Sequence, residues 1–322
     1  MILRGFLALL APFAGSALAE GFLLDLPIDC DLGQTCYIQQ YVDHDPSEAA
    51  QDYRCAGLSY DGHNGTDFAL PHLAMMQQGV PVLAAARGVV VGLRDGMADE
   101  VYSQANAQKV KGRECGNGVV LRHAGGWETQ YCHLKSGSLT VEKGDRVAAG
   151  TPLGQVGMSG RAAFPHLHLS VRKDGKPVDP FVPSGKTSCS ETPSQTLWRD
   201  PPPYRAGGLL LSGFADQVPD YSEVKAGTAN TRLSAKSANI VAFSFGFGFR
   251  KGDILDISIT GPKGLRLSKR HHFDKAKALA FRAIGQKRRR APWPTGDYSG
   301  RAVLIRGGAE ISSHSWTATI AD

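Results

Sequence analysis

Short apolar runs, each closed by a glycine turn, recur along residues 53–183, and helical periodicity is weak throughout this region. The chain contains 38 glycines and 18 prolines among its 322 residues, which favours many turns over a helical bundle. The apolar runs have the usual length of β-strands. We therefore expect a β domain here, with strands at residues 80–86, 88–93, 118–122 and 128–133.

The C-terminal part, residues 205–322, shows the same kind of pattern. Between residues 240 and 249 phenylalanines alternate with serine or glycine, and a period of two indicates a strand with one packed face. Further strand candidates separated by Gly/Pro turns predict a C-terminal β-sandwich-like domain. The phenylalanines expected in its core are Phe243, Phe245, Phe247 and Phe249, and the other expected strands are residues 254–260, 264–268, 298–306 and 311–320.

The first 19 residues have the pattern of a signal peptide. Arg4 precedes an apolar run over residues 6–13, and Ala17-Leu18-Ala19 supplies the small residues that a signal peptidase needs. The apolar run is shorter than the ~20 residues that span a bilayer, which disfavours a membrane anchor. No later run is long or apolar enough to be a transmembrane helix, so we expect an exported, soluble protein.

Two polar segments flank the expected β domain. Residues 20–52 contain scattered prolines and cysteines, and we interpret them as an N-terminal arm of low regularity. Residues 184–204 end in three consecutive prolines, which is typical of a semi-rigid linker.

Six cysteines, all before residue 190, favour disulfides in an exported chain. Cys30 and Cys36 could close a local loop, and Cys115 and Cys132 flank a plausible hairpin, although six cysteines allow 15 connectivities. A cysteine-based zinc site is disfavoured because no pair has C-x-x-C spacing.

Three local patterns carry residues suited to a metal or catalytic site. His63 and Asp67 are four residues apart, which lets an imidazole and a carboxylate share one face of a strand or helix. Taken alone, this pair also fits a loop histidine beside a capping aspartate. His166 and His168 would share one face of a strand. Taken alone, they also fit two surface histidines on an edge strand.

The third pattern is His133, at the end of an expected strand. By strand alternation, Tyr131 and His133 would share one face, and Cys132 and Leu134 the opposite face. A lone histidine in this position would usually be structural.

Taken together, the three patterns predict a catalytic metal site. His63, Asp67 and one histidine of the 166/168 pair give two imidazoles and one carboxylate, which is a ligand set of catalytic zinc with a fourth position left for water. Zinc lowers the pKa of a water that it binds to about 7. The two remaining histidines could then move the proton of that water and stabilise an oxyanion.

Four blocks follow one another in the expected β domain: H-N-G-T-D (63–67), Y-C-H-L (131–134), V-E-K-G-D-R-V-A-A-G-T-P-L-G-Q-V-G-M-S-G (141–160) and P-H-L-H-L-S-V-R-K-D-G-K-P-V-D-P (165–180). In their order and spacing the chain resembles the lysostaphin-type (LytM-like) zinc metallopeptidases, which are mostly peptidoglycan endopeptidases of the bacterial envelope. The resemblance covers residues 53–183 and implies a compact antiparallel β fold, of the sheet or barrel-sandwich kind, with the metal in a groove.

The resemblance also implies roles for individual residues. One zinc ion would be held by His63, Asp67 and His168, the catalytic histidines would be His133 and His166, and Asn117 would be a substrate-binding residue before a groove strand. Two features depart from the family: Cys115 and Cys132 are not general in it, and residues 94–113 are longer and more polar than its usual connection. We expect residues 94–113 to form a lid or a groove wall.

The expected function is therefore zinc-dependent hydrolysis of peptide bonds in peptidoglycan, in the periplasm. Two alternatives remain open. Some relatives of this fold have lost metal ligands and act by binding and activating cell-wall amidases, and a metallopeptidase of this kind could instead act on proteins.

Positive charge in the C-terminal part suggests an anionic envelope partner. The chain has a formal net charge of +6, and cations gather at Lys269-Arg270, Lys275, Lys277, Arg282 and residues 287–290. The alternative is a solvated charged loop. No recognition motif accompanies the charge, so nucleic-acid binding is not expected.

Overall fold

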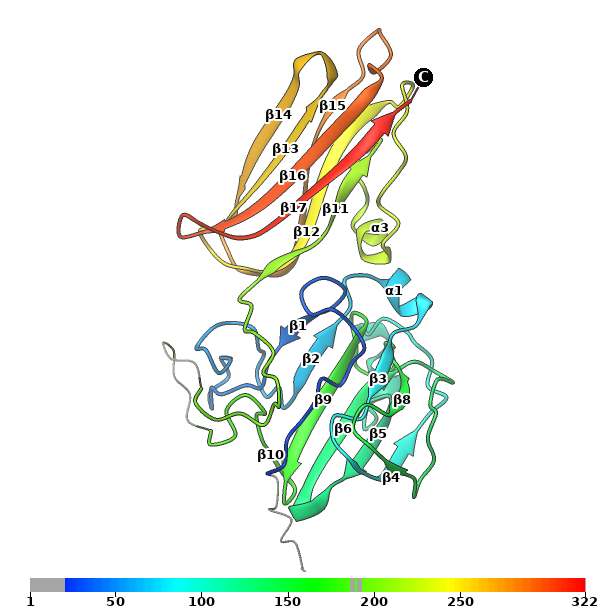
Figure 1. Cartoon of the computed structure of the whole chain (residues 1–322), viewed down its shortest axis with the longest axis vertical. Coiled ribbons are helices and arrows are strands. Elements are labelled where there is room, and N and C mark those ends of the chain that lie inside the picture. Colours follow the sequence, from blue (N-terminus) through cyan, green and yellow to red (C-terminus); the bar gives the residue numbers. More distant parts are fainter. Residues whose placement is uncertain (1–20, 186–188, 190–192, 322) are drawn as a thin grey trace, which may run out of the picture.

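The computed structural model describes residues 21–185, 189 and 193–321, so the predicted signal peptide and part of the predicted linker lie outside the described residues. The strands form two groups, one between residues 37 and 177 and the other between residues 208 and 320 (Figure 1). Every pairing between these strands is antiparallel, which confirms the predicted all-β fold class.

The first group is built around one eight-stranded sheet. Its strands are β1 (Tyr37–Gln40), β2 (Thr66–Ala69), β4 (Gly88–Arg94), β5 (Asn117–Arg122), β6 (Trp127–Leu134), β7 (Arg146–Val147), β9 (His166–Lys173) and β10 (Lys176–Pro177). They lie in the order β1-β2-β9-β6-β5-β4-β7, with β10 paired to β9. A separate two-stranded sheet pairs β3 (Pro81–Leu83) with β8 (Pro152–Gln155). The helical segments are α1 (Leu73–Gln78), α2 (Ala107–Val110) and the 3-10 turns η1 (Gln104–Asn106) and η2 (Ala124–Gly126).

The central strands of this sheet have one apolar and one polar face. Phe68 of β2, Leu167 and Leu169 of β9 and Tyr131 of β6 are all buried in one hydrophobic core. Because side chains alternate along a strand, the neighbouring residues of β2 and β9 point to the opposite face. The polar site described below lies on that opposite face.

The expectation of low regularity in residues 20–52 was wrong for part of that segment. Strand β1 extends the main sheet by pairing with β2, and Leu24 and Ile28 are buried in the same core. Apolar and aromatic residues such as Tyr37 and Ile38 suit a strand, but the surrounding prolines and cysteines concealed the short run.

The second group is a sandwich of two sheets, as predicted. A three-stranded sheet has the order β11-β12-β15, and a four-stranded sheet has the order β14-β13-β16-β17. Apolar side chains of β12, such as Ile240, pack against those of β13 and β16, such as Ile257 and Leu304. The strands are β11 (Gly208–Ala215), β12 (Asn239–Phe249), β13 (Ile254–Gly261), β14 (Leu265–His272), β15 (Lys277–Lys287), β16 (Gly296–Arg306) and β17 (Ala309–Ile320), with α3 (Tyr221–Ala226) and the 3-10 turn η3 (Pro262–Gly264).

The four phenylalanines of β12 are buried, but they do not share one packed face as predicted. Phe243 and Phe245 pack on the outer side of the three-stranded sheet, with Val224 of α3. Phe249 packs in the core between the sheets. Gly248 has a φ of +66°, a conformation that side-chain-bearing residues rarely adopt, and it interrupts the alternation just before Phe249.

The interpretation of the basic segments as a charged loop was wrong for part of them, because five of the named cations lie on strands, whereas Lys275 and residues 288–290 lie in loops. Lys269 and Arg270 belong to β14, and Lys277, Arg282 and Lys287 belong to β15. Strand β15 has the sequence KALAFRAIGQK, which contains enough apolar residues for a packed strand. Its cations had instead favoured the prediction of a loop.

Three disulfides are formed, and none of the described cysteines is free. The two expected pairs, Cys30–Cys36 and Cys115–Cys132, are both present. The third joins Cys55 to Cys189, across 134 residues. In the part of the chain that the structure describes, no helix has both the length and the hydropathy needed to cross a membrane.

A buried ion pair fastens the sandwich to the preceding segment. Arg306 of β16 donates to both carboxylate oxygens of Asp253, at 2.9 and 2.7 Å, and also to the carbonyls of Ala206 and Gly248. The Asp253 side chain is only 1% exposed. Removing the guanidinium would therefore leave a carboxylate without its partner inside the protein.

We predict that Arg306→Met lowers the free energy of unfolding by about 3–5 kcal/mol, the usual effect of breaking a buried ion pair. The matched control is Arg301→Met on the same strand, since the Arg301–Glu310 pair is about half exposed on both sides. That control should cost less than about 1 kcal/mol. Urea unfolding followed by tryptophan fluorescence measures both, and equal losses would contradict the prediction.

Candidate metal centre and groove

The centre is organised by the pairing of β2 with β9. In this antiparallel register Asp67 lies directly opposite His168, and Ala69 lies opposite His166. Side chains of opposed residues point to the same side of a sheet. The leucines that alternate with the two histidines, Leu167 and Leu169, are fully buried in the core, so both imidazoles emerge on the polar face.

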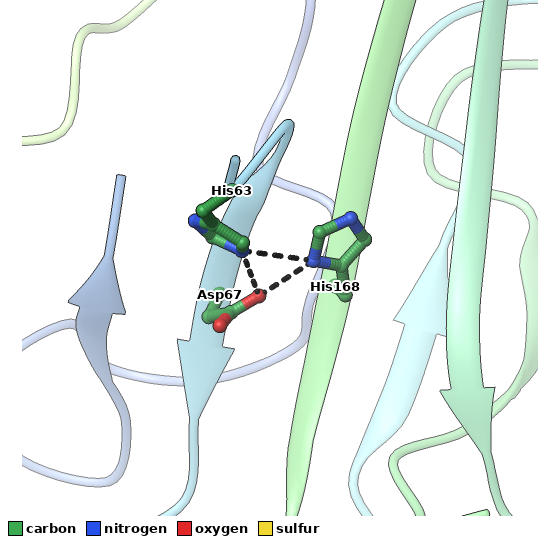
Figure 2. Close-up of side chains that lie close together, drawn as sticks. All are labelled: His63, Asp67 and His168. Atoms are coloured by element: carbon green, nitrogen blue, oxygen red, sulfur yellow. Dashed lines mark hydrogen bonds and ion pairs between the residues drawn. The ribbon is translucent and has the colours of Figure 1, made fainter. Parts of the chain in front are cut away.

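His63 approaches the same point from the loop that precedes β2 (Figure 2). Its Nε2 atom lies 3.2 Å from Asp67 Oδ1 and 3.1 Å from His168 Nδ1. His168 Nδ1 lies 2.8 Å from the same Asp67 oxygen. Three potential ligand atoms, from stretches about a hundred residues apart in sequence, therefore form one small triangle.

The outer hydrogen bonds of the two imidazoles determine which nitrogens face the triangle. His63 Nδ1 donates to the carbonyl of Tyr41 at 2.7 Å, so Nε2 of the neutral ring carries a lone pair. His168 Nε2 lies 2.9 Å from Ser170 Oγ, whose hydroxyl lies 3.5 Å from the acceptor Asn64 Oδ1. If the serine donates to Asn64, it accepts from His168 Nε2, and Nδ1 of the neutral ring carries the lone pair.

The close approach of these groups shifts the pKa values of Asp67 and His63. Burial works to raise the pKa of Asp67, but the neighbouring imidazoles of His63, His166 and His168 hold that pKa well below its usual range. Burial works to lower the pKa of His63, but the Asp67 carboxylate and the hydrogen bond to the Tyr41 carbonyl raise it overall. Both directions indicate that the triangle favours a positive charge at its centre.

The donor set fits a zinc ion. Zinc binds histidine nitrogen and carboxylate oxygen at about 2.0–2.2 Å, so neighbouring ligands of a tetrahedral ion lie roughly 3.3 Å apart. The observed separations of 2.8–3.2 Å are close to that value. His63, Asp67 and His168 are also the group that meets the geometric requirements of a metal site among the described residues.

His133 reaches the groove by a route that strand alternation did not predict. Opposite β5 the register shifts: Asn117 pairs with Leu134, but Val119 pairs with Tyr131. Cys132 and His133 thus form a β-bulge opposite Gly118, and His133 has a φ of +64°.

The expected sharing of faces around His133 was therefore wrong. Tyr131 and Leu134 both point into the core, with no exposed surface, whereas Cys132 and His133 both line the groove. The bulge inserts one residue into the alternation, which changes the side to which every later residue of the strand points.

His133 and His166 lie next to each other, with ring centroids 4.6 Å apart. His133 Nδ1 donates to the carbonyl of Ser159 at 2.8 Å, and His166 Nδ1 donates to that of Phe164 at 2.9 Å. Burial lowers the pKa of both rings, and His133 falls well below the ordinary value because the nearby imidazoles add to the effect. Both rings are therefore neutral near pH 7, with Nε2 unprotonated.

His166 also approaches the carboxylate of the triangle. Its Nε2 lies 3.7 Å from Asp67 Oδ1. All five residues expected at the site are thus brought together on one face of the sheet.

The centre opens into a groove of about 330 Å³. The charged side chains along it include two arginines in different situations. Arg172 is engaged, donating to Glu128 and to Gln130. Arg161 lies over the ring of Tyr102 at 5.6 Å and is exposed, without an ion pair within 4 Å to any residue that the structure describes.

Asn117 lies below the groove surface rather than in it. Its side chain is fully buried, accepting from the Met97 amide and donating to the carbonyls of Met97 and Leu134. Its amide is used within the chain and has no exposed atom to offer a substrate. Its contacts instead hold residues 94–113 to the end of β6.

Residues 94–113, expected as a lid or groove wall, are tied to the domain at several points. Asp99 accepts from the amides of Ser136 and Met158, and the Tyr102 amide donates to the Ala162 carbonyl. The groove-lining residues come from other segments, and residues 94–113 contact that lining through the Tyr102 ring, which lies 5.6 Å from the Arg161 guanidinium.

The groups that orient the imidazoles were not predicted from the sequence. Ser170 lies two residues after His168 on the same strand, and continuing the alternation by one step would have identified it. The other orienting groups are the carbonyls of Tyr41, Ser159 and Phe164. Every residue has a carbonyl, so no sequence signal could have indicated these three.

The segment that contains the site is similar to known peptidases. The sequence model of peptidase family M23 matches residues 61–180 of this chain. Over 120 residues the chain is 38% identical to the DD-carboxypeptidase/endopeptidase Mpg of Neisseria meningitidis serogroup B, covering 37% of this chain and 22% of that protein. Over 117 residues it is 36% identical to the peptidoglycan DD-endopeptidase ShyA of Vibrio cholerae, covering 36% of this chain and 22% of that protein. The matched segment thus spans about a fifth of the length of these relatives.

Among solved structures, a zinc containing peptidase from Vibrio cholerae is 27% identical, with a TM-score of 0.29 over 44% of this chain and 38% of that chain. The similarity to this family rests on the sequence matches, and the matched residues 61–180 include all five clustered residues. Residues 61–180 of this chain, which contain the candidate metal centre, are therefore similar to peptidase family M23.

Proposed function

We propose that this protein is a zinc metalloendopeptidase that hydrolyses peptide bonds of peptidoglycan. The observation that carries the proposal is the triangle of His63 Nε2, Asp67 Oδ1 and His168 Nδ1, with separations of 2.8–3.2 Å, at an open groove. His133 lines the same groove, and His166 lies next to His133 and close to Asp67. Metal ligands and potential proton-transfer groups thus meet where a peptide could bind.

His63, Asp67 and His168 would hold one zinc ion. When bound, zinc polarises the carbonyl to be attacked and makes a water molecule nucleophilic at neutral pH. The chain itself orients the two histidine ligands. The Tyr41 carbonyl fixes the imidazole of His63, and the Ser170 hydroxyl fixes that of His168. Such outer hydrogen bonds set the tautomer and the direction of metal-binding histidines.

His133 and His166 would share proton transfer and oxyanion stabilisation. Each ring is held by a hydrogen bond from Nδ1 to a backbone carbonyl, which leaves Nε2 free to take a proton from the attacking water. Once protonated, the same Nε2 can donate a hydrogen bond to the oxygen on which negative charge develops.

Two observations favour peptidoglycan as the substrate. The relative ShyA is named a peptidoglycan DD-endopeptidase, and the relative Mpg is named a DD-carboxypeptidase/endopeptidase. The stem peptides of peptidoglycan carry free carboxylates, and Arg161 offers an exposed guanidinium on the groove wall. Arginine is well suited to bind a carboxylate.

The proposed location is outside the cytoplasm, with the periplasm as the best candidate. The leader pattern at residues 1–19 supports export. Three disulfides fit an oxidising compartment. The exposed cations of β14 and β15, among them Arg266, Lys269, Arg270, Lys277 and Lys287, would suit an anionic envelope partner.

The non-enzymatic alternative is activation of a cell-wall amidase. It is disfavoured because a domain that does not catalyse a reaction needs no metal ligands, whereas His63, Asp67 and His168 are all present here and their ligand atoms lie close together. A protein-directed peptidase would use the same centre, so only the substrate distinguishes it.

We predict that the protein lacking residues 1–19 releases peptide-bond cleavage products from purified sacculi, that a chelator stops the release, and that added zinc restores it. Fragment analysis by mass spectrometry identifies the bond that is cut. Chelator-sensitive cleavage of a casein substrate without any cleavage of sacculi would favour a protein-directed peptidase. Absence of both activities would favour the activator.

We predict that His168→Ala and His133→Ala separate metal binding from proton transfer. His168→Ala should lose bound zinc, because only two ligand atoms remain. His133→Ala should keep about one zinc per chain and lose roughly 10²–10⁴-fold in rate, the usual contribution of a general acid–base group. Elemental analysis and the sacculus assay measure the two properties, and a fully active His133→Ala protein would refute the assigned role.

We predict that Ser170→Ala weakens zinc binding about 10–100-fold, because His168 loses the hydrogen bond that fixes its orientation. Competition against a chromophoric chelator measures the affinity. Ser138→Ala is a control, since the Ser138 hydroxyl bonds to the Lys135 carbonyl and Gln155 amide and not to the centre. Equal affinities in the two variants would show that the orienting bond is unimportant.

A further inference from the structure

The Cys115–Cys132 disulfide lies on the groove wall, directly beside His133. We propose that this disulfide positions His133 by holding the β-bulge that turns its ring into the groove, so that turnover depends on it while zinc binding does not. The inference rests on the proposed function and concerns the residue that would move the proton.

The bulge decides which side chain reaches the groove. The register of β9 with β6 places Cys132 opposite His168, on the groove face. Without the bulge, alternation would place the next groove-facing side chain at Leu134. With the bulge, His133 takes that position and lies beside His166, while Leu134 enters the core.

This arrangement is unfavourable for the backbone taken alone. His133 has a φ of +64°, a left-handed conformation in which a Cβ atom is crowded. Such conformations persist where the surrounding structure holds them, and they gather at active sites. The surroundings of His133 therefore have to supply the restraint.

Cys115 restrains the backbone of the bulge through two interactions. Its sulfur is bonded to Cys132, the residue immediately before His133. Its carbonyl accepts a hydrogen bond of 2.8 Å from the His133 amide. One residue thus fixes both halves of the bulge, by a covalent bond on one side and a hydrogen bond on the other.

Cys115 is itself held in place. The following Gly116 has a φ of +66°, and a Cβ atom there would lie 2.4 Å from the backbone of Ser159. Ser159 is the residue whose carbonyl accepts from His133 Nδ1. The disulfide, the glycine turn and Ser159 therefore surround the bulge.

The metal ligands depend on other contacts. Asp67 and His168 are set by the register of β2 with β9, and His63 is set by its bonds to Tyr41 and to the Tyr60 carbonyl. Loss of the disulfide should therefore relax His133 while the triangle stays intact.

The test compares two paired variants of the chain without residues 1–19. Cys115→Ala with Cys132→Val removes the disulfide beside His133 and keeps apolar side chains at that position. Cys30→Ala with Cys36→Val removes a disulfide in the N-terminal segment, away from the groove lining. Zinc content, thermal unfolding, and kcat and KM on a soluble cross-linked muropeptide are measured for both.

We expect the Cys115/Cys132 variant to keep about one zinc per chain and its KM, and to lose at least tenfold in kcat. The Cys30/Cys36 variant should stay within twofold of the unaltered protein in kcat. Equal kcat losses in the two variants would overturn the inference. Loss of zinc in the Cys115/Cys132 variant, with or without unfolding, would also overturn it, because the disulfide would then hold the whole domain.

A spectroscopic measurement separates this inference from the proposed function. The imidazole signals of ¹⁵N-labelled histidine, assigned with His133→Gln, should shift or broaden for His133 in the Cys115/Cys132 variant and not for His63. If the unaltered protein cleaves no peptidoglycan, the proposed function fails, and the ring signals still decide the positioning role. Unchanged His133 signals would overturn it.

Discussion

The pairing of β2 with β9 is the constraint on which the rest of the site depends. Asp67 faces His168 across this pair, and a slip by one residue would send both imidazoles of β9 into the core. The register is secured from the other side of the sheet, where Phe68, Leu167 and Leu169 are fully buried. Hydrophobic burial on one face thus sets the distances between polar atoms on the opposite face.

Backbone carbonyls, rather than side chains, orient most of the imidazoles. Tyr41, Ser159 and Phe164 each accept a hydrogen bond from an Nδ1 atom, and Ser170 is the exception with its hydroxyl. Carbonyl positions follow the course of the main chain, so the packing of the surrounding loops controls the direction of the rings. Tyr41 comes from the N-terminal segment, which is therefore part of the site and not a detached arm.

The regular sheet and the irregular bulge make different contributions to the centre. Regular pairing brings together Asp67 and the two histidines of β9, because opposed and alternate residues share a face. Regular pairing alone would have turned His133 away from them. The bulge at Cys132 and His133 corrects its direction, and bulges beside active sites commonly re-aim a side chain in this way.

The sequence by itself determined the all-β class and the sandwich at the C-terminal end, through period-two alternation and glycine turns. The spacing of His63 with Asp67 and of His166 with His168 indicated candidate ligands, and His133 became a candidate only in combination with them. Two of the disulfide pairs were suggested, while other connectivities stayed open. Resemblance to a peptidase family then assigned His168, rather than His166, to the metal.

Only the tertiary structure decided where the strands depart from regular alternation and which backbone groups the side chains meet. The bulge reverses the expected face of His133, and Gly248 separates Phe249 from the other phenylalanines. The side-chain amide of Asn117 is hydrogen-bonded to the backbone of Met97 inside the protein, and neither strand alternation nor the family resemblance predicted this. The physical reason is common to all three: which face a side chain occupies, and which carbonyl meets it, depends on contacts between segments far apart in the sequence.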